Sequence, residues 1–121
     1  MAFYKWSDLD ADLITPKYST AYGPSIQGEQ VDVGYFTFPP NTQAKTHAHP
    51  NEQFTIVLKG RGKWTVGGEE KILGPGEVVH NLPDVPHSLE VLDEELHVVN
   101  CKSVVPGWSV KHAKWENETE E

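Results

Sequence analysis

Short runs of residues that favour β-strands, separated by turn residues, occupy most of this sequence. Valine, tyrosine and phenylalanine, which pack well on a pleated surface, recur in these runs. Between two of the runs, Gly67-Gly68 is a dipeptide that closes a tight hairpin. The pattern predicts about seven or eight short strands and hence one antiparallel barrel of the all-β class. The runs cover residues 30–38, 54–58, 63–66, 71–73, 77–82, 88–92 and 96–105.

Helical periodicity is almost absent from the chain. Only residues 7–10 have a helical pattern, in which Ser7 is expected to cap a turn that Pro16 would end. No internal repeat and no linker divides the 121 residues, a length that suits one domain. The expected parts are an N-terminal extension with the first strand or strands (1–29), the barrel (30–107) and a C-terminal extension that ends in a disordered acidic tail (108–121).

The balance of charge argues against two classes of partner. The chain carries 18 acidic and 10 basic residues, a formal net charge of −8, whereas nucleic acids and anionic membranes are bound by clustered positive charge. Its single cysteine, Cys101, forms no intrachain disulfide. No apolar run has the length that a signal peptide or a membrane helix needs. We therefore expect a cytoplasmic protein that binds neither nucleic acid nor membrane.

Three histidines and a glutamine predict a metal site in the middle of the sequence. His47 and His49 are two residues apart, so on a β-strand their imidazoles point to the same side, and imidazole is the commonest metal ligand. Gln53 is a further inward position after a turn, and His87 begins a later strand. Three imidazoles and one oxygen donor leave room for a substrate, as catalytic metals require. The expected cofactor is a divalent ion, namely zinc, manganese, iron or nickel.

Two stretches around these residues resemble the two motifs of the cupin superfamily. Residues 47–60 are similar to the first motif, which has two histidines, an acidic or amide ligand and a later glycine, here Gly60. Residues 74–87 resemble the second motif, whose histidine completes the site. The resemblance implies a single cupin barrel, that is, a double-stranded β-helix or jelly roll. It also implies that Gln53 takes the ligand position and that Glu52, one residue earlier, points to the opposite face.

Other polar residues on the predicted strands are candidates for the pocket. Tyr35, Asn100 and Lys102 are candidate catalytic groups, because inward projection is possible on their strands. His80 and His97 lie near the second motif, so each could line the pocket or be an ordinary surface histidine. One residue of strand register reverses the direction of each side chain. The sequence therefore leaves the general acid or base open.

The first motif is also similar to that of the pectin-degradation family of small cupins, whose members linearise unsaturated uronates. The two share the proline after the second histidine, the glutamine ligand and a Gly-Gly-Glu hairpin. That family has an acid on the last strand and an arginine soon after, whereas this chain has Asn100, Lys102 and then Trp108. Cupin-type polyketide cyclases are a second precedent. The resemblance implies a metal-dependent lyase, isomerase or cyclase that acts on a small molecule with a carbonyl or hydroxyl group.

Two other functions fit the same ligands. Cupins that bind ferrous iron activate oxygen, so an iron-dependent dioxygenase is one alternative. A non-catalytic ligand-binding or regulatory cupin is another, because fold and ligands do not determine the chemistry. The resemblance further implies a homodimer, since cupins often pair through their sheets. The aromatic residues near the C-terminus, Trp108 and Trp115, suit such an interface.

Overall fold

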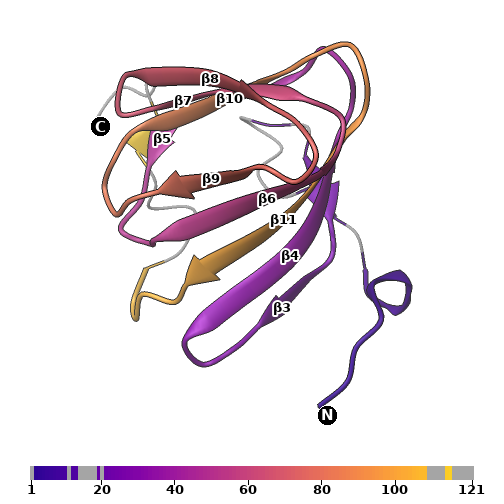
Figure 1. The fold of residues 1–121 in the computed structure, drawn as a ribbon. Helices are drawn as coiled ribbons and strands as arrows, with labels where there is room; N and C mark the ends of the chain where they lie inside the picture. Colours follow the sequence, from indigo (N-terminus) through magenta and orange to yellow (C-terminus); the bar gives the residue numbers. More distant parts are fainter. Residues whose placement is uncertain (1, 11, 14–18, 20, 109–113, 116–121) are drawn as a thin grey trace.

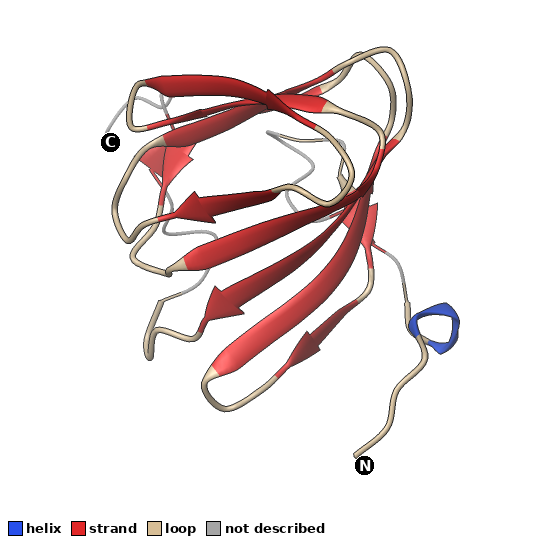
Figure 2. Cartoon of the chain, in the orientation of Figure 1, coloured by secondary structure: helices blue, strands red, loops and turns tan. Residues whose placement is uncertain are grey.

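The computed structural model describes residues 2–10, 12–13, 19, 21–108 and 114–115, and these residues form two antiparallel sheets that face each other (Figure 1). The only helical element among them is a 3₁₀ turn, η1 (Trp6–Asp8) (Figure 2). The prediction of an all-β jelly roll is confirmed. Within the described ranges, no helix is long and apolar enough to cross a membrane.

The first sheet contains seven of the described strands and forms the lower layer in Figure 1. Its order is β1-β2-β4-β11-β6-β9, and β3 also pairs with β4. The long strands β4 and β11 lie side by side in an unbroken antiparallel register. The strands are β1 (Asp12–Leu13), β2 (Tyr22–Gly23), β3 (Ser25–Gln27), β4 (Val31–Phe38), β6 (Gln53–Lys59), β9 (Val78–Asn81) and β11 (Leu96–Ser103).

The second sheet contains five of the described strands in the order β12-β5-β10-β7-β8. From β4 to β11 the chain passes from one sheet to the other at every connection except the β7–β8 hairpin. This alternation brings residues that are distant in sequence to the same space between the sheets. The strands are β5 (Gln43–Ala48), β7 (Gly62–Val66), β8 (Glu69–Leu73), β10 (His87–Val91) and β12 (Lys114–Trp115).

Every strand predicted from an apolar run is present, with its ends shifted by at most two residues. The predicted hairpin is also present between β7 and β8. Its two turn residues, Gly67 and Gly68, have φ values of 56° and 86°. Both values lie in the left-handed region, which a tight hairpin turn needs and which glycine adopts without the steric cost of a Cβ atom.

The N-terminal region differs from the expectation. The predicted cap at Ser7 is wrong, because η1 begins at Trp6 and its N-cap position is Lys5, which makes no side-chain capping bond. The turn is only three residues long, since Leu9 already has an extended backbone (φ −106°, ψ 151°). Pro16 and the acidic tail over residues 116–121 lie outside the described residues.

One central strand, β5, has no counterpart among the apolar runs of the sequence. Its residues, Gln-Ala-Lys-Thr-His-Ala, are mostly polar, so neither β propensity nor apolar alternation marks it. It forms because β10 pairs with one edge and β12 with the other. Tertiary pairing therefore determines this strand, which carries His47.

The core lies between the sheets and follows the alternation of side chains along each strand. From the first sheet, Leu96, Val57 and Val98 are 0 %, 1 % and 1 % exposed. The second sheet contributes Trp64 and Leu89 to the same cluster. Full burial of an aliphatic side chain stabilises the folded state by about 1.5–3 kcal/mol. This packing holds the two sheets in place on either side of the site described below.

Candidate metal centre

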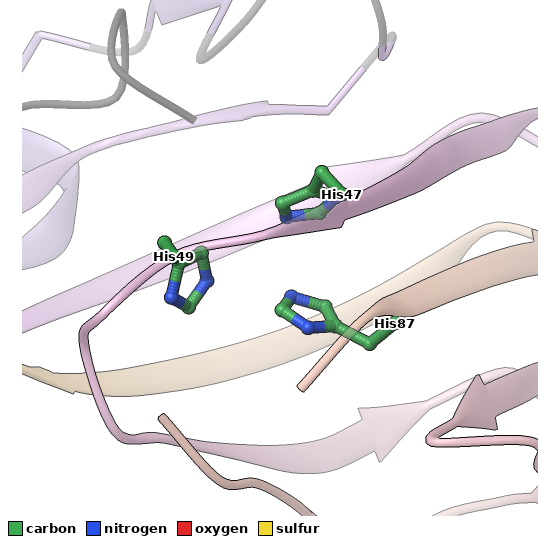
Figure 3. Close-up of side chains that lie close together, drawn as sticks. All are labelled: His47, His49 and His87. Carbon is green, nitrogen blue, oxygen red and sulfur yellow. The ribbon is translucent and has the colours of Figure 1, made fainter. Parts of the chain in front are cut away.

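Three histidines from the second sheet converge on one point (Figure 3). His47 is on β5, His49 follows the end of that strand, and His87 begins β10. His47 and His87 are direct partners across the two strands. One ligand nitrogen from each ring can be chosen so that all three lie within 4.8 Å of one another. The cluster therefore has the form of a divalent-metal site.

The backbone fixes the orientation of each imidazole. The Nδ1 atoms of His47, His49 and His87 lie 2.9, 3.0 and 3.0 Å from the carbonyl oxygens of Lys45, Asn51 and Val85. A carbonyl oxygen only accepts, so each Nδ1 carries the proton and each Nε2 keeps its lone pair. This arrangement is typical of histidines that bind metals through Nε2.

Burial keeps these imidazoles neutral. Burial, together with the neighbouring His87, lowers the pKa values of His47 and His49 to about 4. Burial also lowers the pKa of His87. At neutral pH all three rings are therefore in the unprotonated form that a metal requires.

The donor set fits a divalent ion. The His87 Nε2 atom is buried and has no hydrogen-bond partner among the described residues, although buried polar atoms are nearly always paired. A positively charged ion beside it would supply the missing partner. Neutral imidazoles with a side-chain oxygen suit divalent transition-metal ions.

Gln53 faces the histidines from the first sheet. It lines a cavity of about 290 Å³ that is also lined by all three histidines. Its amide nitrogen donates to the Thr55 hydroxyl at 3.1 Å, and that hydroxyl donates to Asn100 Oδ1 at 2.7 Å. The amide oxygen of Gln53 takes no part in these two hydrogen bonds, so it is the atom available to an ion.

The neighbouring residue Glu52 points away from the cavity, as strand alternation predicts. Its carboxylate lies 2.7 Å from His80 Nε2 on the exposed side of the first sheet. His80 also stacks on Phe54, with ring centroids 4.2 Å apart. Neither Glu52 nor His80 is among the residues that line the cavity. The structure therefore brings Gln53, and not Glu52, to the three histidines.

Two of the three candidate catalytic residues reach the cavity. Asn100 and Lys102 line it from β11. Burial lowers the pKa of the Lys102 ammonium, and the nearby Asp32 carboxylate partly offsets this effect. The positive charge of Lys102 in turn contributes to the lowered pKa values of His47 and His49. Lys102 is thus electrostatically coupled to the histidine cluster.

Tyr35, the third candidate catalytic residue, does not line the cavity. On β4 the residues that alternate with it, Gly34 and Phe36, line the cavity, so Tyr35 points to the opposite face. Its hydroxyl lies 2.6 Å from His97 Nδ1, and His97 Nε2 lies 2.6 Å from Glu95 Oε1. His97 therefore belongs to the outer face as well.

Several further residues reach the cavity without having been expected there, among them one aromatic and two polar side chains. Trp108 lies against His49, with ring centroids 5.8 Å apart, and Asp32 and Asn81 line the wall. Because side chains alternate along a strand, one known inward residue on β4 and one on β9 would have indicated that Asp32 and Asn81 also point inward. Trp108 lies beyond the end of β11, in a segment where no periodicity indicates direction.

Comparison with known sequences identifies one family. Residues 34–100 match the sequence profile of the family described as "Cupin domain". The matched span runs from β4 to β11 and includes the three histidines and Gln53. No curated protein matches the sequence of the chain.

Comparison of folds gives the same result. An RmlC-like cupin from Shewanella frigidimarina superposes with a TM-score of 0.78 at 17% identity, covering 88% of this chain and 94% of that one. KdgF from a Halomonas species gives 0.77 at 16% identity, covering 88% and 96%. The polyketide cyclase RemF from Streptomyces resistomycificus gives 0.82 at 16% identity, covering 99% and 88%. At such identities the likeness establishes the fold alone.

Proposed function

This chain belongs to the cupin family, and on that premise we propose that it is a metal-dependent enzyme acting on a small molecule. The reaction class that we propose is that of a lyase, isomerase or cyclase, and the substrate carries a carbonyl or hydroxyl group. The observation that carries the proposal is the convergence of three neutral imidazoles on one wall of a cavity that a half-buried lysine also lines.

In this proposal His47, His49, His87 and Gln53 hold a divalent ion. When bound there, such an ion acts as a Lewis acid that polarises a substrate oxygen. The backbone bonds to the Nδ1 atoms keep the imidazoles aimed at the cavity. The hydrogen bonds from Gln53 to Thr55 and from Thr55 to Asn100 hold the side-chain amide of Gln53 in one orientation.

Lys102 supplies the second element of the chemistry. Lys102 lines the cavity, where it is partly desolvated and its electrostatic interactions are stronger than in water. In reactions of this class, negative charge accumulates on the carbonyl oxygen of the substrate. We assign Lys102 the role of stabilising this charge. Asn100, two residues earlier on β11, also lines the cavity and is assigned the role of a hydrogen-bonding group.

The fold relatives support the proposal as analogies. One of the solved relatives is a polyketide cyclase, and another is KdgF. Because a fold hosts many chemistries, these names indicate a reaction class that the site accommodates and not the substrate of this chain. The argument for catalysis therefore depends on the residues of the cavity itself.

Metal analysis followed by anaerobic assays tests the proposal. We expect one divalent ion per chain in the purified or reconstituted protein, and activity with zinc in the absence of oxygen. The His49→Ala variant should lose the ion, whereas His80→Ala, on the outer face, should retain it. A protein that takes up no stoichiometric metal would contradict the proposal. Oxygen uptake that requires iron would favour a dioxygenase, and ligand binding without turnover would favour a non-catalytic cupin.

We also propose that the protein is a homodimer that pairs through the outer face of the first sheet. On that face Phe54, Leu58 and Val78 are 41 %, 46 % and 52 % exposed. Apolar side chains grouped on one sheet face are typical of protein interfaces. Light scattering should give twice the mass of the chain, and Val78→Arg should give the mass of one chain. A monomeric wild-type protein would contradict this part of the proposal.

A further inference from the structure

A row of four polar residues crosses the inner face of the first sheet. Gln53 on β6 pairs in register with Asn81 on β9 and with Lys102 on β11, and Lys102 pairs in register with Asp32 on β4. All four line the cavity. Since neighbouring strands lie about 4.8 Å apart, the row spans about 14 Å. It faces the space that the histidine cluster enters from the other sheet.

The inner face becomes less polar with distance from this row. The next inward pair along β6 and β11 is Thr55 and Asn100, which are partners in register. The pair after that is Val57 and Val98, with Phe36 beside Val98 on β4. The cavity therefore has a polar end at the row and an apolar end in the core. A ligand that fills it needs polar groups at one end and an apolar body at the other.

Asn81 has a polar atom that the protein does not satisfy. The residue is 1 % exposed, and its Oδ1 atom has no hydrogen-bond partner among the described residues. A buried carbonyl oxygen accepts a hydrogen bond in nearly all proteins. Asn81 lines the cavity, so a small shift of its side chain would bring this oxygen to a donor on the ligand. A hydroxyl group is the simplest such donor.

The charges at the polar end favour an anion. Imidazoles that bind an ion through Nε2 are neutral, as is the Gln53 amide, so these ligands leave both charges of a divalent ion uncompensated. Lys102 and Asp32 carry opposite single charges and offset each other. With the ion bound, the polar end has a net charge of about +2. A carboxylate reduces this charge and can also accept a hydrogen bond from Lys102.

We propose that the cavity binds a small hydroxy acid with an apolar body. Its carboxylate lies between the ion and Lys102, its hydroxyl donates to Asn81 Oδ1, and its body points toward the apolar end of the cavity. This inference rests on the proposed function, because the charge count includes the ion. A volume of about 290 Å³ is at the lower end of the range for ligand cavities, so the ligand is small.

Calorimetry on the zinc-loaded full chain with three matched probes tests the inference. Mandelate has the hydroxyl, the carboxylate and a phenyl body, phenylacetate lacks the hydroxyl, and mandelamide lacks the charge. We expect mandelate to bind at least about tenfold more tightly than either of the others. Lys102→Met should weaken mandelate binding by about 10- to 100-fold, the range for a hydrogen bond to a charged group, and should leave mandelamide unchanged.

Two variants complete the experiment. Asn81→Leu should bind mandelate and phenylacetate equally, because the acceptor for the hydroxyl is gone. Lys59→Met is the matched control, since Lys59 is exposed and outside the cavity, and it should behave as the wild type. The three probes with the wild-type protein still decide the question if a variant does not fold. Equal affinity for all three would overturn the inference.

Zinc content, measured on the same samples, separates this inference from the proposed function. If the protein holds zinc and does not prefer mandelate, the hydroxy acid is wrong and the metal site stands. If the protein holds no zinc, the proposed function is wrong, and the same titrations on the metal-free chain test Asn81 and Lys102 by themselves. A preference for mandelate there would support the hydroxy-acid site, and its absence would overturn it.

Discussion

His47 and His87 lie directly opposite each other on the neighbouring strands β5 and β10, with ring centroids 4.3 Å apart. Position 47 follows a run of polar residues, and position 87 is forty residues later in the chain. The pairing of the two strands brings the rings together. Two neutral rings held this close form a preorganised metal site, because a backbone carbonyl orients each ring before an ion binds.

Removal of one of these rings should remove most of the metal affinity. We expect His87→Ala to weaken zinc binding by at least about 100-fold. Loss of a group that only orients a ligand lowers metal affinity by about 10- to 100-fold, and loss of the ligand itself should lower it further. Competition with a coloured chelator measures the affinity. His97→Ala is the control, because His97 lies on the outer face, and it should bind zinc as the wild type does.

The stability of the metal-free protein should fall as the pH is lowered. The pKa values of His47 and His49 are about 4 in the folded protein and 6.5 in an unfolded chain. Between these values the unfolded state binds more protons, so acid favours unfolding. The stabilisation is complete above about pH 6.5 and is lost as the pH falls toward 4.

Thermal unfolding after treatment with EDTA measures this effect. We expect the Tm of the wild type to be several degrees lower at pH 5 than at pH 7.5. The double variant His47→Gln/His49→Gln lacks both titrating groups, and its Tm should depend less on pH in this interval. An equal dependence in the two proteins would show that other groups are responsible.

Tyr35 should contribute to stability and not to metal binding. Its hydroxyl is 2.6 Å from His97 Nδ1 on the outer face of the first sheet. Loss of a single hydrogen bond of this kind costs about 1 kcal/mol. We expect Tyr35→Phe to lower the free energy of unfolding in urea by about this amount and to keep its full zinc content. Loss of zinc in this variant would contradict the assignment of Tyr35 to the outer face.

Much of the fold was predictable from the sequence because its strands have local signals. The apolar runs and the Gly67-Gly68 hairpin predicted β7 to within one residue and β8 to within two. The β5 strand was not predictable in this way, since its residues are polar and pairing with β10 and β12 determines it. The Ser7 cap failed because a three-residue 3₁₀ turn is too short to need a side-chain cap.

The site was predictable to the extent that spacing determines direction. Two-residue spacing placed His47 and His49 on one side, and motif spacing selected Gln53 over Glu52. For Tyr35 and Lys102 the sequence showed only that each is on a strand. The direction of such a side chain depends on the pairing of β4 with β11, and this register is a tertiary property.

Gly60, the last residue of the first motif, should tolerate no side chain. Its φ is +79°, and an added Cβ atom would lie 2.4 Å from the carbonyl oxygen of Glu95. We expect Gly60→Ala to cost at least about 2 kcal/mol, the sum of left-handed strain and a backbone clash. Gly76 has a similar φ of +87° with nothing within 4 Å of an added Cβ. Gly76→Ala should therefore cost only about 1 kcal/mol in the same urea titration.

Compared with a carboxylate at the same position, the amide of Gln53 should lower the affinity for metal and raise the stability of the metal-free protein. The Thr55 hydroxyl has one hydrogen, which it donates to Asn100 Oδ1, and it accepts from the Gln53 amide nitrogen. In Gln53→Glu, the carboxylate and Asn100 both need the same hydrogen, so one bond is lost. We expect the metal-free variant to be about 1 kcal/mol less stable than the wild type.

The same variant should bind zinc at least about tenfold more tightly, because it adds a negative charge at the ligand position. Chelator competition gives the affinity, and urea unfolding of the metal-free protein gives the stability. Thr55→Val removes the hydroxyl hydrogen for which the carboxylate and Asn100 compete. In this background, Gln53→Glu should lower the stability by less and should still raise the affinity for zinc. An unchanged zinc affinity in both backgrounds would show that residue 53 does not contact the ion, since a charge placed on a ligand atom must alter the binding of a divalent cation.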